Sequence, residues 1–158
     1  CEAFVDVVHH ALAAEFLQAL VDAYKTFGVR VVSDAIGNFA GPLAGLHAGL
    51  SVSHRPYLVS VPCDSPFLPD DLVARMFAAL EGSGAEIAVA KTGQWQQPVF
   101  CIVRCGVLDH LTDFLKNGGR KVDAWYATLR VAEVAFDDEA DAFYNINTSD
   151  ELKALETG

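Results

Sequence analysis

The chain has few basic residues, and they form no cluster. Eleven lysines and arginines stand against 21 aspartates and glutamates, which gives a formal net charge of −10. Proteins that bind nucleic acid present a basic patch or stripe to the phosphate backbone. The composition therefore argues against a nucleic-acid partner. If the substrate carries phosphates, a metal and a few local cations must offset the repulsion.

Long hydrophobic runs and paired cysteines are also absent. Although 52% of the residues are hydrophobic, no run reaches the ~18 apolar residues of a membrane-spanning helix, and no signal peptide is visible. The four cysteines, Cys1, Cys63, Cys101 and Cys105, include no CxxC pair. These absences predict a cytoplasmic protein with reduced thiols and no membrane partner.

The chain length predicts a single globular domain over residues 1–158. The first residue is Cys1 and not methionine, which suggests a fragment of a longer protein. Nothing in the sequence indicates an oligomeric state.

Short apolar runs alternate with helical patterns along the chain. Strands are expected at residues 2–8, 29–33, 57–61, 86–91, 98–104 and 131–136, and helices at 11–27, 43–51, 69–81, 107–115, 122–129 and from 148 onward. This alternation predicts an α/β fold with a mostly parallel sheet. The polar loop expected at 92–97 is short enough for one antiparallel pair, whereas a parallel pair needs a longer crossover.

Two of these helices carry more specific expectations. Gly45 and Gly49 share one face of the helix at 43–51, which favours a close approach of that helix to the sheet. The helix that begins at Pro69 is expected to bury an apolar stripe. Its members are Leu72, Val73, Met76, Phe77 and Leu80.

Two carboxylates follow predicted strands directly. Asp64 ends the apolar run that begins at Tyr57, and Asp34 ends the run at 29–33. A continuous apolar run is typical of a strand that is buried on both faces, and ligands of parallel sheets bind beyond the carboxyl ends of the strands. Asp64 is suited there to hold Mg²⁺ together with substrate phosphates. Each aspartate is also suited merely to order its own turn.

Four segments, taken in order, resemble the molybdenum cofactor guanylyltransferase family. They are Val32-Ser33-Asp34 with Gly41-Pro42-Leu43-Ala44-Gly45-Leu46, then Pro62-Cys63-Asp64-Ser65-Pro66-Phe67-Leu68-Pro69, then Gly119-Arg120-Lys121-Val122, and Asn145-Ile146-Asn147-Thr148-Ser149-Asp150-Glu151-Leu152. The resemblance implies a Rossmann-like nucleotidyltransferase fold. It also implies transfer of GMP from GTP to molybdopterin, which gives the guanine dinucleotide cofactor and pyrophosphate.

The resemblance also implies roles for individual residues. Asp64 matches the catalytic Mg²⁺ ligand that contacts the nucleotide phosphates, and Asp34, with Gly41 and Gly45, matches the site for the guanine nucleotide. On the pterin side, the matching residues are Arg120, Lys121, Asn145 and Asn147. The implied partners are GTP, molybdopterin, and proteins that deliver or accept the cofactor. The asparagines are also suited to a turn, and the two basic residues to a solvated helix start.

The chain departs from the family pattern at its beginning. The Gly-rich loop and lysine that hold the triphosphate, and the first central strand of the sheet, would lie before Cys1. We therefore expect a gap in the sheet, with a bare strand edge. Smaller departures are His9, where relatives have asparagine, and Gln97-Pro98, where they often have His-Pro. Two alternatives remain: a cytidylyltransferase that acts on the same pterin, and a non-catalytic binding domain that lacks the triphosphate loop.

Overall fold

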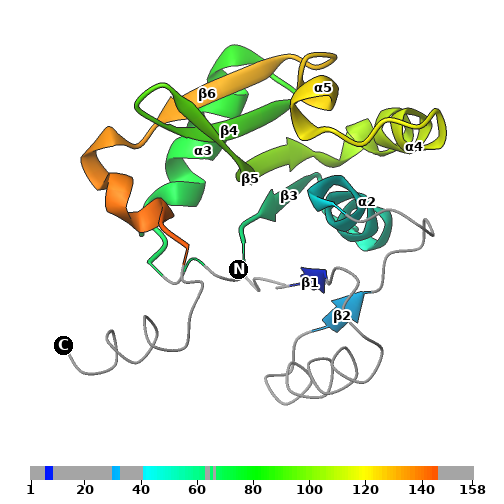
Figure 1. Ribbon diagram of the computed structural model, residues 1–158, viewed down its shortest axis with the longest axis horizontal. Coiled ribbons are helices and arrows are strands. Elements are labelled where there is room, and N and C mark those ends of the chain that lie inside the picture. The colour runs from blue at the N-terminus through cyan, green and yellow to red at the C-terminus, as the bar shows by residue number, and fades with distance from the viewer. Residues whose placement is uncertain (1–5, 9–29, 33–40, 63–64, 66, 146–158) are drawn as a thin grey trace. The chain divides into compact units, whose positions relative to one another are not determined.

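The computed structural model describes residues 6–8, 30–32, 41–62, 65 and 67–145 (Figure 1). The chain divides into two compact units, each described here by itself. The first comprises residues 1–58 and 105–128, and the second comprises residues 59–104 and 129–158. The helices expected at 11–27 and after 148 lie outside the described residues.

The described residues of the first unit form a short parallel ribbon and three helices. Strand β1, Asp6–Val8, pairs in parallel with β2, Arg30–Val32, so both strand predictions are confirmed at their described residues. The helices are α2, Pro42–Val52, α4, Leu108–Lys116, and α5, Val122–Tyr126, and a 3₁₀ turn, η1, Cys105–Val107, leads into α4. All three helices were predicted, although α5 is shorter than expected.

Helix α2 begins as its sequence predicts and lies close to the following strand. Pro42 occupies the first turn, where its missing N–H costs no hydrogen bond. A Cβ placed on Gly49 would lie 3.1 Å from Cδ2 of Leu58 in β3, Tyr57–Ser60. This confirms the close approach expected for Gly49.

Helix α4 ends in a Schellman motif. The N–H of Gly118 donates to the carbonyl of Leu115 over 3.1 Å, and that of Gly119 donates to the carbonyl of Phe114 over 2.9 Å. Gly118 has φ 89°, a left-handed conformation that favours glycine. The two glycines therefore end the helix as predicted and lead the chain directly into Arg120.

The second unit contains most of a sheet with the strand order β3-β5-β4-β6, because the boundary between the units falls within β3. Strand β4, Ile87–Thr92, pairs antiparallel with β5, Trp95–Arg104, and parallel with β6, Val131–Ala135. Residues 87–90 are fully buried because β4 has a neighbour on each side. The structure thus confirms an α/β fold with a mixed sheet. The predicted polar loop at 92–97 is instead a tight turn at Gly93, and β5 begins at Trp95.

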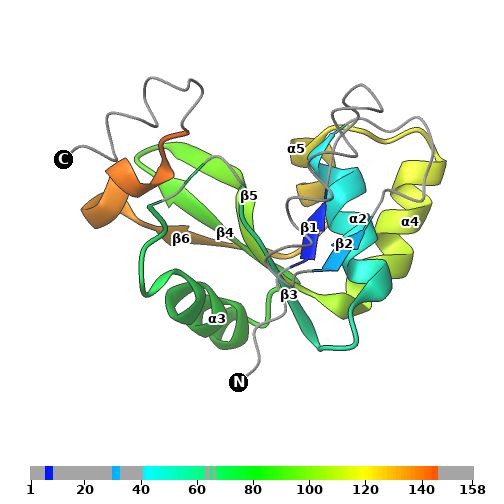
Figure 2. The same cartoon turned by 90° about the horizontal axis from the view of Figure 1, so that it is seen from below.

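Helix α3, Leu72–Ser83, packs on β4 and β6, and Figure 2 shows it on one face of the sheet. Leu72, Met76 and Leu80, spaced four residues apart, are buried as predicted. Val73 and Phe77 are 50% and 41% exposed, so the predicted stripe is too wide. Each lies one residue past a buried position, about 100° farther around the helix and away from the sheet.

The strand before Asp64 is less buried than its sequence predicted. Val59 and Val61 are each 38% exposed, because β3 is an edge strand of the described sheet and only β5 pairs with it. The described strands form two separate sheets, β1-β2 and β3-β5-β4-β6. The gap and bare strand edge expected within one sheet stay a prediction.

The segment that follows β6 was not predicted. Residues Asp137–Phe143 form a 3₁₀ segment, η2, after β6. Its last residue, Phe143, packs edge-on against Phe100, with ring centroids 4.6 Å apart, and against Phe136 at 5.3 Å. These ring contacts fix the chain to the core of the second unit just before Asn145.

Candidate functional site

The structure describes five of the eight residues predicted for the site. Gly41, Gly45, Arg120 and Lys121 belong to the first unit, and Asn145 belongs to the second. Asp34, Asp64 and Asn147 lie outside the described residues. The expectation that Asp34 and Asp64 converge on one pocket therefore stays a prediction.

Gly41 adopts a conformation that only glycine accommodates without strain. It precedes α2 with φ 146° and ψ 160°, and its carbonyl accepts the first-turn hydrogen bond from the N–H of Ala44 over 3.1 Å. A Cβ at this position would meet no atom within 4 Å, so backbone conformation and not crowding selects glycine here. Gly45 lies in the first turns of the same helix. These facts are consistent with a backbone-lined nucleotide loop.

The two predicted basic residues have different surroundings. Nη1 of Arg120 donates to the carbonyl of Leu115 over 3.0 Å and also to that of Gly119. This places a cation at the C-terminal end of α4, where it stabilises the helix dipole. Lys121 occupies the N-cap position of α5 without a side-chain capping bond, and it is exposed. Its ammonium has no hydrogen bond or ion pair with the residues that the structure describes. Lys121 is therefore the better placed of the two to meet an anion.

Asn145 is held by a residue that the sequence did not single out. The hydroxyl of Ser65 donates to Oδ1 of Asn145 over 2.8 Å, although 80 residues separate them. Ser65 is 4% exposed, whereas Asn145 is exposed. A serine beside Asp64 in a proline-flanked loop was the available signal, but sequence position alone does not identify its partner.

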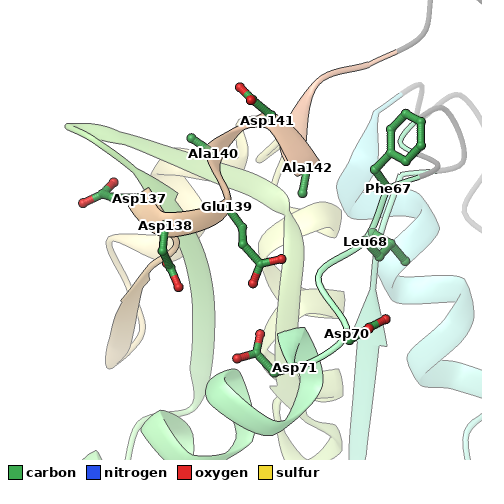
Figure 3. Close-up of a pocket in the computed structure, with 10 residues that line it drawn as sticks. All are labelled: Phe67, Leu68, Asp70, Asp71, Asp137, Asp138, Glu139, Ala140, Asp141 and Ala142. Carbon is green, nitrogen blue, oxygen red and sulfur yellow. The ribbon is translucent and has the colours of Figure 1, made fainter. Parts of the chain in front are cut away.

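A cavity of about 990 Å³ opens in the second unit between η2 and the start of α3 (Figure 3). Its walls carry six carboxylates and four apolar residues: Asp70, Asp71, Asp137, Asp138, Glu139 and Asp141, with Phe67, Leu68, Ala140 and Ala142. In Figure 3, Glu139 and Asp71 extend toward one another from opposite walls, whereas Asp137 and Asp141 point outward.

Arg75 offsets part of this negative charge. Its guanidinium donates to both carboxylate oxygens of Asp138, over 2.8 and 3.1 Å, and lies 4.1 Å from the ring centroid of Phe136. The hydrogen bonds from Arg75 lower the pKa of Asp138, and the same pair raises the pKa of Arg75. The remaining carboxylates repel phosphate groups. Among the described residues, no group of three or more histidine, cysteine, aspartate or glutamate side chains is arranged to hold a metal ion. The cavity is therefore poorly suited to a nucleotide, and it contains none of the predicted site residues.

Comparison with known families gives one match over most of the chain. The profile of the family described as "MobA-like NTP transferase domain" matches residues 2–131, which include parts of both units.

Curated relatives and solved structures agree with this match. The chain is 54% identical over 139 residues to a molybdenum cofactor guanylyltransferase of Cupriavidus taiwanensis, covering 85% of this chain and 69% of the relative. It is 51% identical over 142 residues to the protein of that name from Ralstonia nicotianae, covering 84% and 69%. A crystal structure of molybdopterin-guanine dinucleotide biosynthesis protein A from Archaeoglobus fulgidus superimposes with a TM-score of 0.73 and 23% identity, over 96% of this chain and 76% of that one. At that identity the likeness shows the fold alone.

Proposed function

We propose, from the premise that this chain belongs to the MobA-like nucleotidyltransferase family, that it transfers GMP from GTP to molybdopterin. One observation carries the proposal: two guanylyltransferases of molybdenum cofactor synthesis share more than half of the aligned residues with it, over 84–85% of the chain. Residues 1–158 are proposed as one nucleotidyltransferase domain, because the family profile spans both compact units.

The reaction requires positioning and charge neutralisation more than covalent catalysis. A phosphate oxygen of molybdopterin attacks the α-phosphorus of GTP and forms a new P–O bond. The bond from that phosphorus to the β-phosphate oxygen breaks, and pyrophosphate leaves with the electron pair. The protein must hold the attacking and leaving oxygens in line and stabilise the negative charge.

Asp64 is proposed as the residue that holds the divalent cation. A carboxylate together with phosphate oxygens forms the hard oxygen donor set that Mg²⁺ prefers. The cation, when bound, offsets phosphate charge at the reacting centre. In a chain with a formal charge of −10, this neutralisation is a requirement for binding a triphosphate.

The nucleotide and pterin sides are proposed on different segments. Asp34 is a suitable acceptor for the N–H groups of guanine, and the backbone at Gly41 and Gly45 would lie beside it. Lys121 would attract the pterin phosphate, with Arg120 fixing the end of α4 next to it. The remaining pterin contacts are assigned to Asn145 and Asn147. Proteins that deliver or accept the cofactor, and a cytoplasmic location, stay predictions.

The test is nucleotide competition on the protein together with any residues that its gene encodes before Cys1. We expect unlabelled GTP, and not CTP, to suppress the transfer of labelled GMP to molybdopterin. Equal suppression by CTP would refute the guanine assignment. No transfer at all, with molybdopterin still bound, would indicate the non-catalytic alternative.

Asp64→Asn should abolish this transfer because it removes the charge that holds the cation. Asp70→Asn is the matched control, since it makes the same change at an exposed aspartate on the wall of the acidic cavity. Transfer by Asp64→Asn at the rate of the control would contradict the role assigned to Asp64.

A further inference from the structure

Asn117 lies at the end of α4 and is followed directly by Gly118. It is the C-cap residue of the helix, and both residues are exposed. The other asparagines of the chain are Asn38, Asn145 and Asn147, and they are followed by phenylalanine, isoleucine and threonine. Asn117 is therefore the one asparagine whose next residue has no side chain.

An Asn-Gly pair is able to modify itself without an enzyme. The backbone nitrogen of Gly118, once it has lost its proton to base, attacks Cγ of Asn117, and the new C–N bond closes a succinimide ring. The bond from Cγ to Nδ2 breaks, and ammonia leaves with the electron pair and a proton from water. A second water then opens the ring at either carbonyl, which gives aspartate or isoaspartate. Glycine favours this attack because it has no Cβ to crowd the nitrogen.

The folded end of α4 holds the pair in an unreactive geometry. The ψ angle of Asn117 is 9°, which turns the nitrogen of Gly118 toward the backbone nitrogen of Asn117 and away from its Cβ. Ring closure needs the nitrogen on the side of Cβ, so ψ must first change. The N–H of Gly118 also donates to the carbonyl of Leu115 over 3.1 Å. The last turn of α4 must therefore open before Asn117 reacts.

Arg120 stabilises the closed form of this turn. Its Nη1 donates over 3.0 Å to the carbonyl of Leu115, the same carbonyl that accepts from Gly118, and it also donates to the carbonyl of Gly119. Helix ends open at a lower free-energy cost than the core does. These hydrogen bonds therefore control how often the Asn-Gly pair reaches a reactive geometry.

We propose that Asn117 is a site of spontaneous deamidation, whose rate is set by the opening of the last turn of α4 and restrained by Arg120. The product has a carboxylate at the C-terminal end of the helix, where the helix dipole disfavours negative charge. Isoaspartate also carries the main chain through the side-chain carbon, so the hydrogen bonds of Gly118 and Gly119 no longer match. The reaction needs only water and is independent of GMP transfer.

The first test is incubation of the protein at mildly alkaline pH, followed by peptide mass spectrometry. Asn117 should show the mass gain of deamidation before any other asparagine does. A synthetic peptide of residues 114–121 should react about ten- to hundredfold faster than the protein, because opening of the folded turn breaks the two neutral hydrogen bonds of Gly118 and Gly119.

Variants of Arg120 test the restraint. Arg120→Ala should raise the rate at Asn117 about three- to tenfold in the protein, and the same substitution should not raise it in the peptide. Arg130→Ala is the matched control, because Nε of Arg130 donates to the carbonyl of Gly84 at the end of α3 over 3.3 Å. It should leave the rate unchanged. Arg120→Lys keeps the charge but loses the planar guanidinium, so it should raise the rate by a smaller factor even if the alanine variant folds poorly.

Earlier conversion of another asparagine, or no conversion of Asn117 while the peptide reacts, would overturn the inference. Equal rates in the wild type and in both Arg120 variants would remove the role of Arg120. The charge effect is measured with Asn117→Asp, which should lower Tm by roughly 1–4 °C. An unchanged Tm would contradict the expected loss of stability.

Discussion

Replacing Gly119 with alanine tests how the end of α4 positions the Arg120–Lys121 segment. A Cβ at residue 119 would lie 2.3 Å from Cε1 of Phe114 and 2.5 Å from Cδ1, whereas ordinary contacts begin at 3.4 Å. The backbone cannot simply retreat, because the N–H of Gly119 donates to the carbonyl of Phe114 over 2.9 Å. Either the Phe114 ring turns outward, or the end of the helix shifts and moves Arg120 with it.

The structure sets the size of the effect. Overpacking of this kind costs about 1–3 kcal/mol, and Phe114 is only half-buried, so its ring can yield toward solvent. We therefore expect the lower part of the range, about 1–2 kcal/mol. For a chain of this length, that corresponds to a fall in Tm of roughly 2–8 °C. If Lys121 binds the pterin phosphate, KM for molybdopterin should rise as well.

Thermal unfolding of three substitutions, made singly and in combination, isolates the cause. In a Phe114→Ala background, where the ring is gone, Gly119→Ala should cost less than about 0.5 kcal/mol. Gly118→Ala is the matched control: its Cβ would meet nothing within 4 Å, but its φ is 89°. Its cost of about 1 kcal/mol should persist in the Phe114→Ala background, because backbone strain does not depend on the ring. The reasoning is refuted if Gly119→Ala is equally costly with and without the ring.

Two other changes have expected outcomes. Trp125→Phe removes a fully buried indole whose Nε1 donates to Nδ1 of His110 over 3.1 Å, so denaturant unfolding should show a loss of about 1–3 kcal/mol. A loss below about 0.5 kcal/mol would contradict that burial. Arg75→Gln removes the hydrogen bonds that hold the pKa of Asp138 below its ordinary value of 3.8. In the wild type, the ionised Asp138 therefore adds to the free energy of unfolding above pH 3.8, and this addition is lost as the pH falls through the lower pKa of the folded state. The free energy of unfolding should consequently fall less steeply with acid in Arg75→Gln than in the wild type. Identical dependence of unfolding on acid pH in the two proteins would exclude the effect.

Local signals predicted the described elements well. Pro42 favours the start of α2, and the two glycines after α4 favour its end, through the backbone conformation of a few neighbouring residues. These helix boundaries are therefore predictable without knowledge of the rest of the fold. Apolar runs likewise located β4 and β6. The η2 segment was missed because its sequence, Asp137–Phe143, carries no helical period, and its end is fixed by distant rings.

The candidate site was predicted through resemblance more than through geometry. The order of the motifs indicated the family, and curated relatives above 50% identity confirm it. Arg120 and Lys121 are adjacent and have the same charge. The sequence therefore did not indicate which of the two is available to a ligand. The carbonyls of Leu115 and Gly119, which accept from Arg120, distinguish the two residues, and the direction of these carbonyls depends on how α4 ends.

The amino-acid sequence by itself determined the order of the described strands and helices, the start of α2, the end of α4 and the family, because each depends on residue type and short spacing. Tertiary structure alone decided which faces are buried, as at Val73 and Phe77, and which distant groups meet, as at Ser65 and Asn145. The physical reason is range. Backbone preferences act over a few neighbouring residues, whereas burial and hydrogen-bond partners depend on contacts between segments that are far apart in the sequence and meet only in the folded chain.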